Sequence, residues 1–290
     1  MQQLEKRPIR LIALDLDDTT LSSHSELPER NRAILEAAAR QGIEVVPASG
    51  RSFVSMQGVL ELFPWSHYAI CSNGAVVCAL PDGEVLHQKF LPEETIRELQ
   101  RICGGEFLSY EVYVDGQAYA QQDYIEHCGE YMCDEDTEYY VKSTRKPVPD
   151  ILEFIDRHIH EIQSFVICYG NEAVKARILA ALYAPGEDER LQHAYVTSSV
   201  DRLAEIANRD CGKHRGLEFL TGYLGIPQEQ VIAFGNADND AEMLSWAGTG
   251  VAVANASDNC KACADIITGD YRDCGVAQVL EQLIDPDASV

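Results

Sequence analysis

Short apolar runs alternate with helical patterns along the first part of the chain, and each run ends in polar residues. The stretch IRLIALD at 9–15 is apolar throughout rather than alternating, which predicts a strand buried on both faces. The next stretch, PERNRAILEAAARQG, predicts a helix that begins near Pro28 and ends at Gly42. Two more apolar runs, in IEVVPASGR and HYAICSNGA, flank a helical stretch, SFVSMQGVLELF. Strands and helices alternating at this spacing predict right-handed βαβ units on a parallel sheet.

The middle of the chain has a different pattern, in which hairpins and helices are mixed. Asp82-Gly83 and Asp115-Gly116 each separate two alternating runs, and this predicts two β-hairpins. The acidic stretch MCDEDTEYY is expected to be solvated. This section therefore predicts an α+β unit inserted between strands of the sheet. We expect helices near 92–103, 123–132, 148–158 and 171–182, and strands near 163–169 and 193–198.

The sheet pattern resumes after about residue 200. QVIAFGNADND predicts a strand that ends in polar residues, GVAVAN and ADIITG predict further strands, and GVAQVLEQLI predicts a closing helix. The sequence thus predicts an α/β fold, with a discontinuous, doubly wound, Rossmann-like parallel-sheet core and an inserted α+β cap. We expect the core at 1–83 and 193–290, and the cap at 84–192.

Acidic residues strongly outnumber basic residues in this chain of 290 residues. The 47 Asp and Glu residues against 23 Lys and Arg residues give a formal net charge of −24. This charge argues against nucleic acid and anionic membranes as partners, because both are bound through clustered Lys and Arg. A small phosphorylated metabolite is a suitable partner if the site supplies a local cation. The oligomeric state stays open.

The sequence contains neither an apolar run long enough for a membrane helix nor a signal peptide. The expected location is therefore the cytoplasm, and the ten scattered cysteines are expected to be reduced thiols. Cys260-Lys-Ala-Cys263 has the spacing of a zinc knuckle, but no second pair lies nearby in the sequence. We expect these two cysteines to be a helix-surface pair.

Three predicted strands end in residues with reactive or polar side chains. Asp15 and Asp17 follow the first strand, Ser49-Gly50-Arg51 follows the second, and GNADND at 235–240 ends the fifth. In open α/β sheets, ligands bind outside the carboxyl ends of the strands. We therefore expect these three segments to converge on one site.

The acidic end of the first strand indicates a cation site. Asp15 and Asp17 are two residues apart, so their side chains share a face if the strand stays extended. Two carboxylates about 4 Å apart repel by about 4 kcal/mol at an effective dielectric constant of 20, and Asp240 adds a third charge. Oxygen ligands without a His or Cys cluster favour Mg²⁺. The alternative is an acidic surface loop that caps the next helix.

Four short stretches, in this order along the chain, resemble the motifs of the haloacid dehalogenase-like superfamily. DLDDTT at 15–20 resembles DxDGT, ASGR at 48–51 resembles a motif more often written ATGR, EIANRDCGKHRGL contains the lysine motif, and FGNADNDAEML resembles GDxxND. SNGA at 72–75 and GVAVANA at 250–256 are similar to the Cof-type branch, subclass IIB, whose cap is of the C2 type. The resemblance covers nearly the whole predicted core and is only architectural over the cap.

The resemblance implies a phosphatase that forms an aspartyl-phosphate. Asp15 would attack phosphorus, and Asp17 would protonate the leaving alcohol and then deprotonate water. Mg²⁺ would be held by the Asp15 carboxylate, the Asp17 backbone carbonyl, and Asn236 or Asp240. Members of the family act on sugar phosphates, nucleotides, and flavin or other cofactor phosphates, so the substrate stays open.

The remaining candidate residues would hold the phosphate or the substrate, and Ser49 and Lys213 would also be catalytic. Each has an ordinary alternative: Ser49 as a helix cap, Lys213 as a solvated loop residue, Arg51 as part of a surface pair, and the asparagines as turn formers. The candidate contacts to phosphate or substrate are Ser49, Gly50, Arg51, Asn73, Lys213 and Asn239.

The chain also departs from the motifs that it resembles. Asn236 replaces the first Asp of the last motif, and His214 replaces the usual Gly after the lysine. Asp18 for Gly and Thr20 for Leu are milder changes. Two other functions stay open: a phosphomutase that returns the phosphoryl group to a sugar, and a non-enzymatic sensor of phosphorylated ligands with weak activity.

Overall fold

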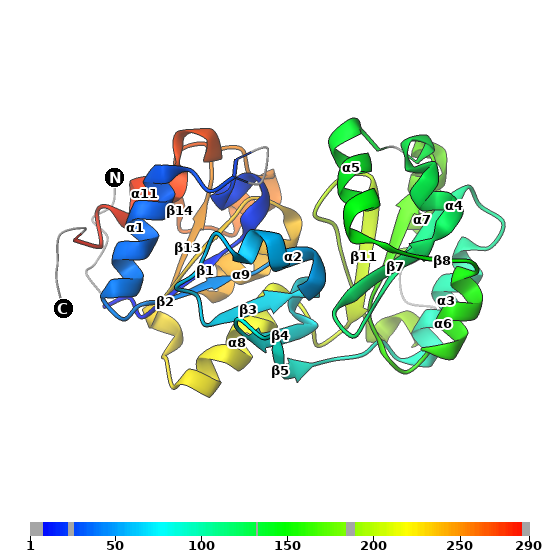
Figure 1. Cartoon of the computed structure of the whole chain (residues 1–290), viewed down its shortest axis with the longest axis horizontal. Helices are drawn as coiled ribbons and strands as arrows, with labels where there is room; N and C mark the ends of the chain where they lie inside the picture. The colour runs from blue at the N-terminus through cyan, green and yellow to red at the C-terminus, as the bar shows by residue number, and fades with distance from the viewer. Residues whose placement is uncertain (1–7, 23–25, 132, 184–188, 286–290) are drawn as a thin grey trace. The chain divides into compact units, whose positions relative to one another are not determined.

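The chain forms two compact units in the computed structural model, which describes residues 8–22, 26–131, 133–183 and 189–285. Figure 1 follows the chain through both units by colour. The first unit consists of Met1–Ser49, Gly58–His87 and Gly212–Val290, and the second consists of Gly50–Gln57 and Gln88–Cys211.

A parallel sheet forms the centre of the first unit, with the strand order β14-β13-β12-β1-β2. All four residues of β1 are buried, as the uninterrupted apolar run predicts. An isolated parallel bridge from Ala48 to Ile70 places β3 beside the end of β2. These strands are β1 (Leu11–Leu14), β2 (Glu44–Pro47), β3 (Tyr68–Cys71), β12 (Val231–Gly235), β13 (Thr249–Ala252) and β14 (Ile266–Ile267).

Helices cover this sheet because its strands have apolar side chains on both faces. Leu11 and Ala13 of β1 pack in one cluster with residues of α8 and α9. Ile12 and Leu14 are equally buried and, by the alternation of a strand, point to the opposite face. On the same unit, α1 packs against α11 (Figure 1). The helices are α1 (Glu29–Arg40), α8 (Lys213–Leu224), α9 (Ala241–Trp246), α10 (Asp258–Ala262) and α11 (Gly275–Leu280), while α2 (Phe53–Leu60) has residues in both units.

The second unit is built on a six-stranded, mostly antiparallel sheet with the order β10-β11-β9-β6-β7-β8. Asp115 and Gly116 connect β6 to β7 with φ values of 50° and 70°, which is the left-handed backbone of a tight hairpin turn. The strands are β6 (Leu108–Val114), β7 (Gln117–Gln121), β8 (Lys146–Val148), β9 (Ile162–Tyr169), β10 (Ala194–Thr197) and β11 (Leu203–Asn208).

Helices lie on both faces of this second sheet. One apolar cluster joins β6 and β9 to α3, α6 and α7, and a separate cluster joins the same sheet to α4 and α5. The helices are α3 (Glu93–Cys103), α4 (Gln122–Glu126), α5 (Glu135–Thr144), α6 (Ile151–Arg157) and α7 (Glu172–Leu182). A parallel-sheet core with an inserted α+β unit is the predicted fold class, and the structure confirms it.

Several local predictions differ from the structure. The acidic stretch has no buried residue over 133–140, as expected of a solvated segment, but it also begins α5, a helix that was not predicted and whose N-cap Asp134 accepts a hydrogen bond from the Thr137 N–H. The helix expected at 123–132 ends at Glu126 and is followed by a short 3₁₀ turn. The second unit continues through Cys211 rather than ending at 192, because β11 pairs with β9.

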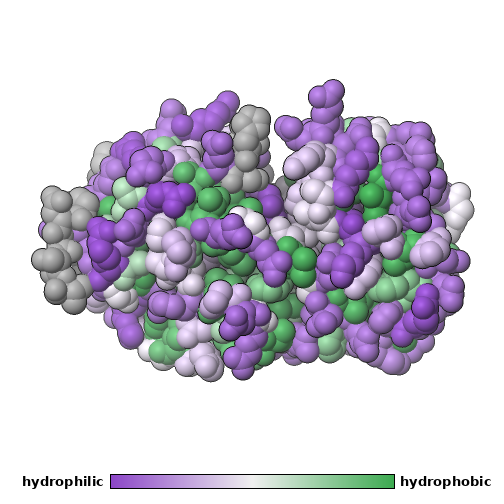
Figure 2. All heavy atoms as spheres, in the orientation of Figure 1, coloured by the Kyte–Doolittle hydropathy of each residue, from purple (hydrophilic) through white to green (hydrophobic). Residues whose placement is uncertain are grey.

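All ten cysteines are free thiols, but Cys260 is buried rather than on the helix surface as expected. Figure 2 shows hydrophilic residues spread over the visible face, with apolar residues scattered between them. Among the described residues, no helix has the length and apolar character that crossing a membrane requires.

Candidate active site

Asp15 is placed at the carboxyl end of β1 by the pairing of that strand with β12. Its N–H donates to the Phe234 carbonyl over 3.0 Å, which is the last step of the ladder. The chain then turns sharply, and the Thr20 hydroxyl donates to the Asp15 carbonyl over 2.6 Å. Asp18 within this turn has a φ of 55°, a conformation that glycine adopts without strain and aspartate tolerates. This explains why aspartate can stand at a motif position where glycine is usual.

Lys213 joins two buried carboxylates. Its Nζ lies 2.6 Å from Asp15 Oδ1 and 2.6 Å from Asp240 Oδ1. The side chains of Lys213 and Asp240 are 0% exposed, and that of Asp15 is 9% exposed. Lys213 is therefore not the solvated loop residue of the ordinary alternative. Asp15 and Lys213 are 198 positions apart in the chain, and they meet here because Lys213 is the first residue of α8.

Burial and neighbouring charges shift the pKa values of Asp15 and Lys213, and each of these two groups affects the pKa of the other. Burial and, after it, the charge of Asp240 raise the pKa of Asp15 to about 7, although Lys213 opposes both effects. Burial works against the charged form of Lys213, but the charges of Asp15 and Asp240 outweigh it and hold the pKa of Lys213 above its ordinary value. Lys213 is thus a permanent cation, and Asp15 is a carboxyl group whose charge depends on pH near neutrality.

The polar loop after β12 folds around Asp240. Asp240 Oδ2 accepts hydrogen bonds from the backbone N–H groups of Asn236 and Ala237, over 2.9 and 3.0 Å. A Cβ atom on Gly235 would collide with the Asp240 side chain, so the end of this strand requires glycine. A glycine at the end of a strand signals such a close approach, but this role of Gly235, like the contact of Thr20 with Asp15, was not predicted from the motifs.

Ser49 and Asn73 lie in one hydrogen-bonded segment of the first unit. Ser49, which is 3% exposed, donates its N–H to the Ile70 carbonyl over 2.9 Å. Its carbonyl accepts from the Asn73 N–H over 3.1 Å, and Asn73 Oδ1 accepts from Asn239 Nδ2 over 3.0 Å. Ser49, Asn73 and Asn239 are therefore linked to one another, whereas Asp17 lies at an exposed position.

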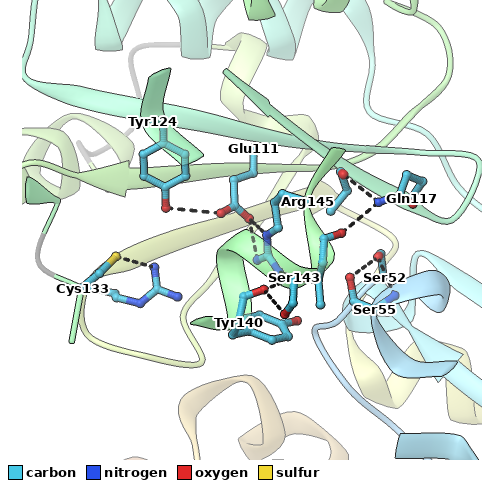
Figure 3. Close-up of polar contacts among 12 residues, drawn as sticks. Ser52, Ser55, Glu111, Gln117, Tyr124, Cys133, Tyr140, Ser143 and Arg145 are labelled. Atoms are coloured by element: carbon cyan, nitrogen blue, oxygen red, sulfur yellow. Dashed lines mark hydrogen bonds and ion pairs between the residues drawn. The ribbon is translucent and has the colours of Figure 1, made fainter. Parts of the chain in front are cut away.

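Gly50 and Arg51 belong to the second unit. The Arg51 guanidinium lies 4.8 Å from the centre of the Tyr140 ring, and the Arg145 guanidinium lies 4.5 Å from it. Arg145 also donates to Glu111 Oε2 through Nε and Nη2, over 2.9 and 2.7 Å (Figure 3). Arg51 is thus stacked on the Tyr140 ring, and Arg145, which forms the buried ion pair with Glu111, lies against the same ring.

A model of the haloacid dehalogenase-like hydrolase family matches residues 12–280. The chain belongs to this family. The family membership predicted from the motifs is thereby confirmed.

Several curated relatives of this haloacid dehalogenase-like hydrolase are phosphatases. Phosphatase YwpJ of Bacillus subtilis is 28% identical over 95% of this chain and 100% of its own length. The 5-amino-6-(5-phospho-D-ribitylamino)uracil phosphatase YitU of the same organism is 28% identical, over 96% of this chain and 98% of its own length. With the family and the fold, these relatives identify an enzyme that hydrolyses phosphoric monoesters.

Solved structures show the same fold over nearly the whole chain. A haloacid dehalogenase-like hydrolase from B. subtilis superposes with a TM-score of 0.81 at 25% identity, covering 95% of this chain and 100% of its own. The subclass IIB sugar phosphatase BT4131 superposes with a TM-score of 0.75 at 18% identity, covering 94% and 98%. The likeness to BT4131 concerns the fold alone.

The hydrolase has oxygen donors that suit a divalent cation. Asp15 Oδ2 and Asn239 Oδ1 are buried and have no hydrogen-bond partner among the described residues. A buried carboxylate oxygen without a partner is costly, so it fits a bound cation or a ligand that donates a hydrogen bond. Among the residues that the structure describes, no three His, Cys, Asp or Glu side chains are grouped so that they could hold a metal ion by themselves. Lys213 instead occupies the position between the carboxylates of Asp15 and Asp240.

Proposed function

We propose that the protein is a Mg²⁺-dependent phosphatase that hydrolyses small phosphate monoesters through an aspartyl-phosphate on Asp15. The observation that carries the proposal is the buried contact of Lys213 Nζ with both Asp15 and Asp240. Lys213 offsets part of the carboxylate charge, so that together with a divalent cation the site would attract an anionic phosphoryl group that the net charge of −24 repels at long range.

The first chemical step uses the free oxygen of Asp15. Asp15 Oδ2 attacks phosphorus, the oxygen–phosphorus bond forms, and the bond from phosphorus to the alcohol oxygen breaks. Asp17 donates a proton to the departing alkoxide. Water then attacks the aspartyl-phosphate, Asp17 accepts its proton, and Asp15 and inorganic phosphate are released. Lys213 stays charged throughout and stabilises the negative charge on the phosphoryl oxygens.

Mg²⁺ would be held by the Asp15 carboxylate, the Asp17 backbone carbonyl, and Asn236 or Asp240. Bound there, it supplies positive charge that offsets the charge of the phosphoryl oxygens. Asp240 already accepts three hydrogen bonds, from Lys213, the Asn236 N–H and the Ala237 N–H. These hydrogen bonds would hold the Asp240 carboxylate in a fixed orientation before a metal ion binds.

Further candidate residues would contact the phosphate or another part of the substrate. Ser49, Gly50 and Asn239 would hold phosphate oxygens through hydroxyl, backbone N–H and amide groups. Arg51, which is stacked on Tyr140, would contact phosphate or another part of the substrate. YitU acts on a phosphorylated ribityl compound, so phosphates of polyols and of the related sugars are the first substrates to test.

A screen of the purified protein against phosphate esters, with Mg²⁺ and with a chelator, tests this proposal. We expect release of inorganic phosphate that needs Mg²⁺ and falls by at least about 10³-fold in Asp15→Asn. Phosphate transfer to a second sugar position without release of phosphate would identify a phosphomutase instead. Tight ligand binding without turnover would identify a sensor, and turnover that persists in Asp15→Asn would overturn the mechanism.

A further inference from the structure

Asn73 occupies a strained and buried turn between β3 and β4 (Val76–Ala79). It is 2% exposed and has φ and ψ angles of 50° and 43°. Its neighbours Ser72 and Gly74 also have positive φ angles, of 51° and 81°. Non-glycine residues in this conformation cost about 1–2 kcal/mol each, so surrounding contacts must stabilise the turn.

Three polar groups of Asn73 bond to three separate segments of the first unit. Its N–H donates to the Ser49 carbonyl over 3.1 Å, and its carbonyl accepts from the Gly212 N–H over 2.9 Å. Its Oδ1 accepts from Asn239 Nδ2 over 3.0 Å. Ser49 follows β2, Gly212 directly precedes Lys213, and Asn239 directly precedes Asp240. One residue therefore connects three segments that the motif order places at the active site.

The same turn packs tightly against the start of α8. A Cβ atom on Gly74 would collide with the Gly212 carbonyl, and a Cβ atom on Gly216 would lie 3.3 Å from the Gly74 Cα. Figure 1 shows α8 beside β3 and β4, and these elements are in contact. The turn thus fixes the backbone from which the Lys213 side chain reaches Asp15.

We infer that Asn73 is a positioning residue that sets the geometry of Ser49, Lys213 and Asp240, and that it does not contact the substrate. This inference rests on the proposed function and replaces the expectation that Asn73 itself binds substrate or phosphate. Burial and the use of its N–H, carbonyl and Oδ1 within the protein both support an indirect role. A misplacement of about 1 Å in an active site costs about 10²-fold in rate, so the link has a measurable effect.

Steady-state kinetics of Asn73→Gly test this inference. Glycine keeps the left-handed backbone and removes only the side-chain link to Asn239. We expect kcat to fall about 10-fold or more while KM changes by less than about 2-fold, because no substrate contact is lost. Asn73→Asp keeps an acceptor for Asn239 and should retain more activity than Asn73→Gly. Asp115→Gly, an equivalent backbone change in the exposed β6–β7 turn, is the matched control and should leave both constants unchanged.

A double-substitution cycle with Asn239→Ala tests whether the side chain acts through Asn239. Adding Asn73→Gly to Asn239→Ala should lower kcat little further, because the shared hydrogen bond is already lost. A large rise in KM with unchanged kcat in Asn73→Gly would show direct substrate binding, and additive losses in the cycle would show that the two residues act separately. Either result overturns the inference. The proposed function fails differently, by turnover that survives in Asp15→Asn.

Discussion

At the scale of single residues, Lys213 determines what the active site can do. Two buried carboxylates repel each other, and the shared ammonium group compensates both charges. The same contact keeps one oxygen of Asp15 bound and leaves the other, Oδ2, without a hydrogen-bond partner among the described residues. The oxygen without a partner is the one that the proposed mechanism uses.

Replacing Lys213 by Met should therefore weaken both stability and catalysis. The substitution leaves two uncompensated buried carboxylates, and we expect the free energy of unfolding to fall by about 3–5 kcal/mol. Turnover should fall by at least about 10²-fold. Urea unfolding and phosphate release measure the two effects. Lys142→Met is the matched control, since Lys142 is 45% exposed and pairs with Glu138 on a helix surface; an equal loss in both variants would contradict a special role for Lys213.

The pKa of Asp15 makes the stability of the metal-free protein depend on pH. The pKa rises from 3.8 to about 7 on folding, so between these values the folded protein keeps a proton that the unfolded chain releases. The free energy of unfolding should therefore fall as pH rises through this window and lose this dependence above about 7. Denaturant unfolding in chelator should show the slope in the wild type and a reduced slope in Asp15→Asn. Parallel pH profiles for the two proteins would show that Asp15 does not carry the effect.

At the scale of elements, the inserted unit depends on a buried ion pair between strand and helix end. Glu111 of β6 is 0% exposed and accepts two hydrogen bonds from Arg145, which follows α5 (Figure 3). The pKa of Arg145 stays well above its ordinary value, because the Glu111 charge outweighs the burial that acts against the cation. The ion pair of Glu111 and Arg145 thus attaches α5, which contains Tyr140, to the second sheet.

Removing one partner of this pair should destabilise the inserted unit. Glu111→Ala leaves a buried guanidinium without its carboxylate, and we expect a loss of about 3–5 kcal/mol in the free energy of unfolding. Glu138→Ala removes a carboxylate from the partly exposed pair with Lys142 and should cost less than about 1 kcal/mol. Urea unfolding followed by circular dichroism compares the variants; similar losses would contradict the importance of burial.

Elements with strong local patterns were predictable, and those that depend on distant pairing were not. The buried run of β1 and the Asp115-Gly116 turn could be predicted from a few adjacent residues. The helix α5 was missed because Val141 is the one buried residue described in it, so the sequence has no apolar stripe there, even though its acidic first turn suits a helix. The strand β11 pairs with β10, which directly precedes it in the chain, and with β9, from which α7 separates it in the sequence. Motif order indicated Asp15, Lys213 and Asp240, but not the hydrogen bonds that position them.

At the scale of the whole molecule, the excess of acidic residues makes a local cation necessary. The net charge is −24, and the buried cluster of Asp15, Asp240 and Lys213 is itself negative when both carboxylates are ionised. A bound divalent cation would reverse the sign of the site and admit a phosphate ester. The substitution of Asn236 for the usual aspartate reduces the charge available to hold that cation.

Asn236→Asp should therefore bind Mg²⁺ more tightly. The backbone N–H of residue 236 donates to Asp240 Oδ2, and this contact survives the substitution. We expect about 10-fold tighter binding from the added charge, measured by calorimetric titration. Asn259→Asp adds the same charge at an exposed position and serves as control. Equal affinities for the wild type and Asn236→Asp would remove residue 236 from the metal site.

The most direct test of the mechanism is mass spectrometry of the protein quenched in acid during turnover of a phosphate ester. The account predicts one phosphoryl group on the peptide that contains Asp15, located on Asp15, and no such group in Asp15→Asn. Rapid turnover without any phosphorylated peptide, or a phosphoryl group on another residue, would contradict it.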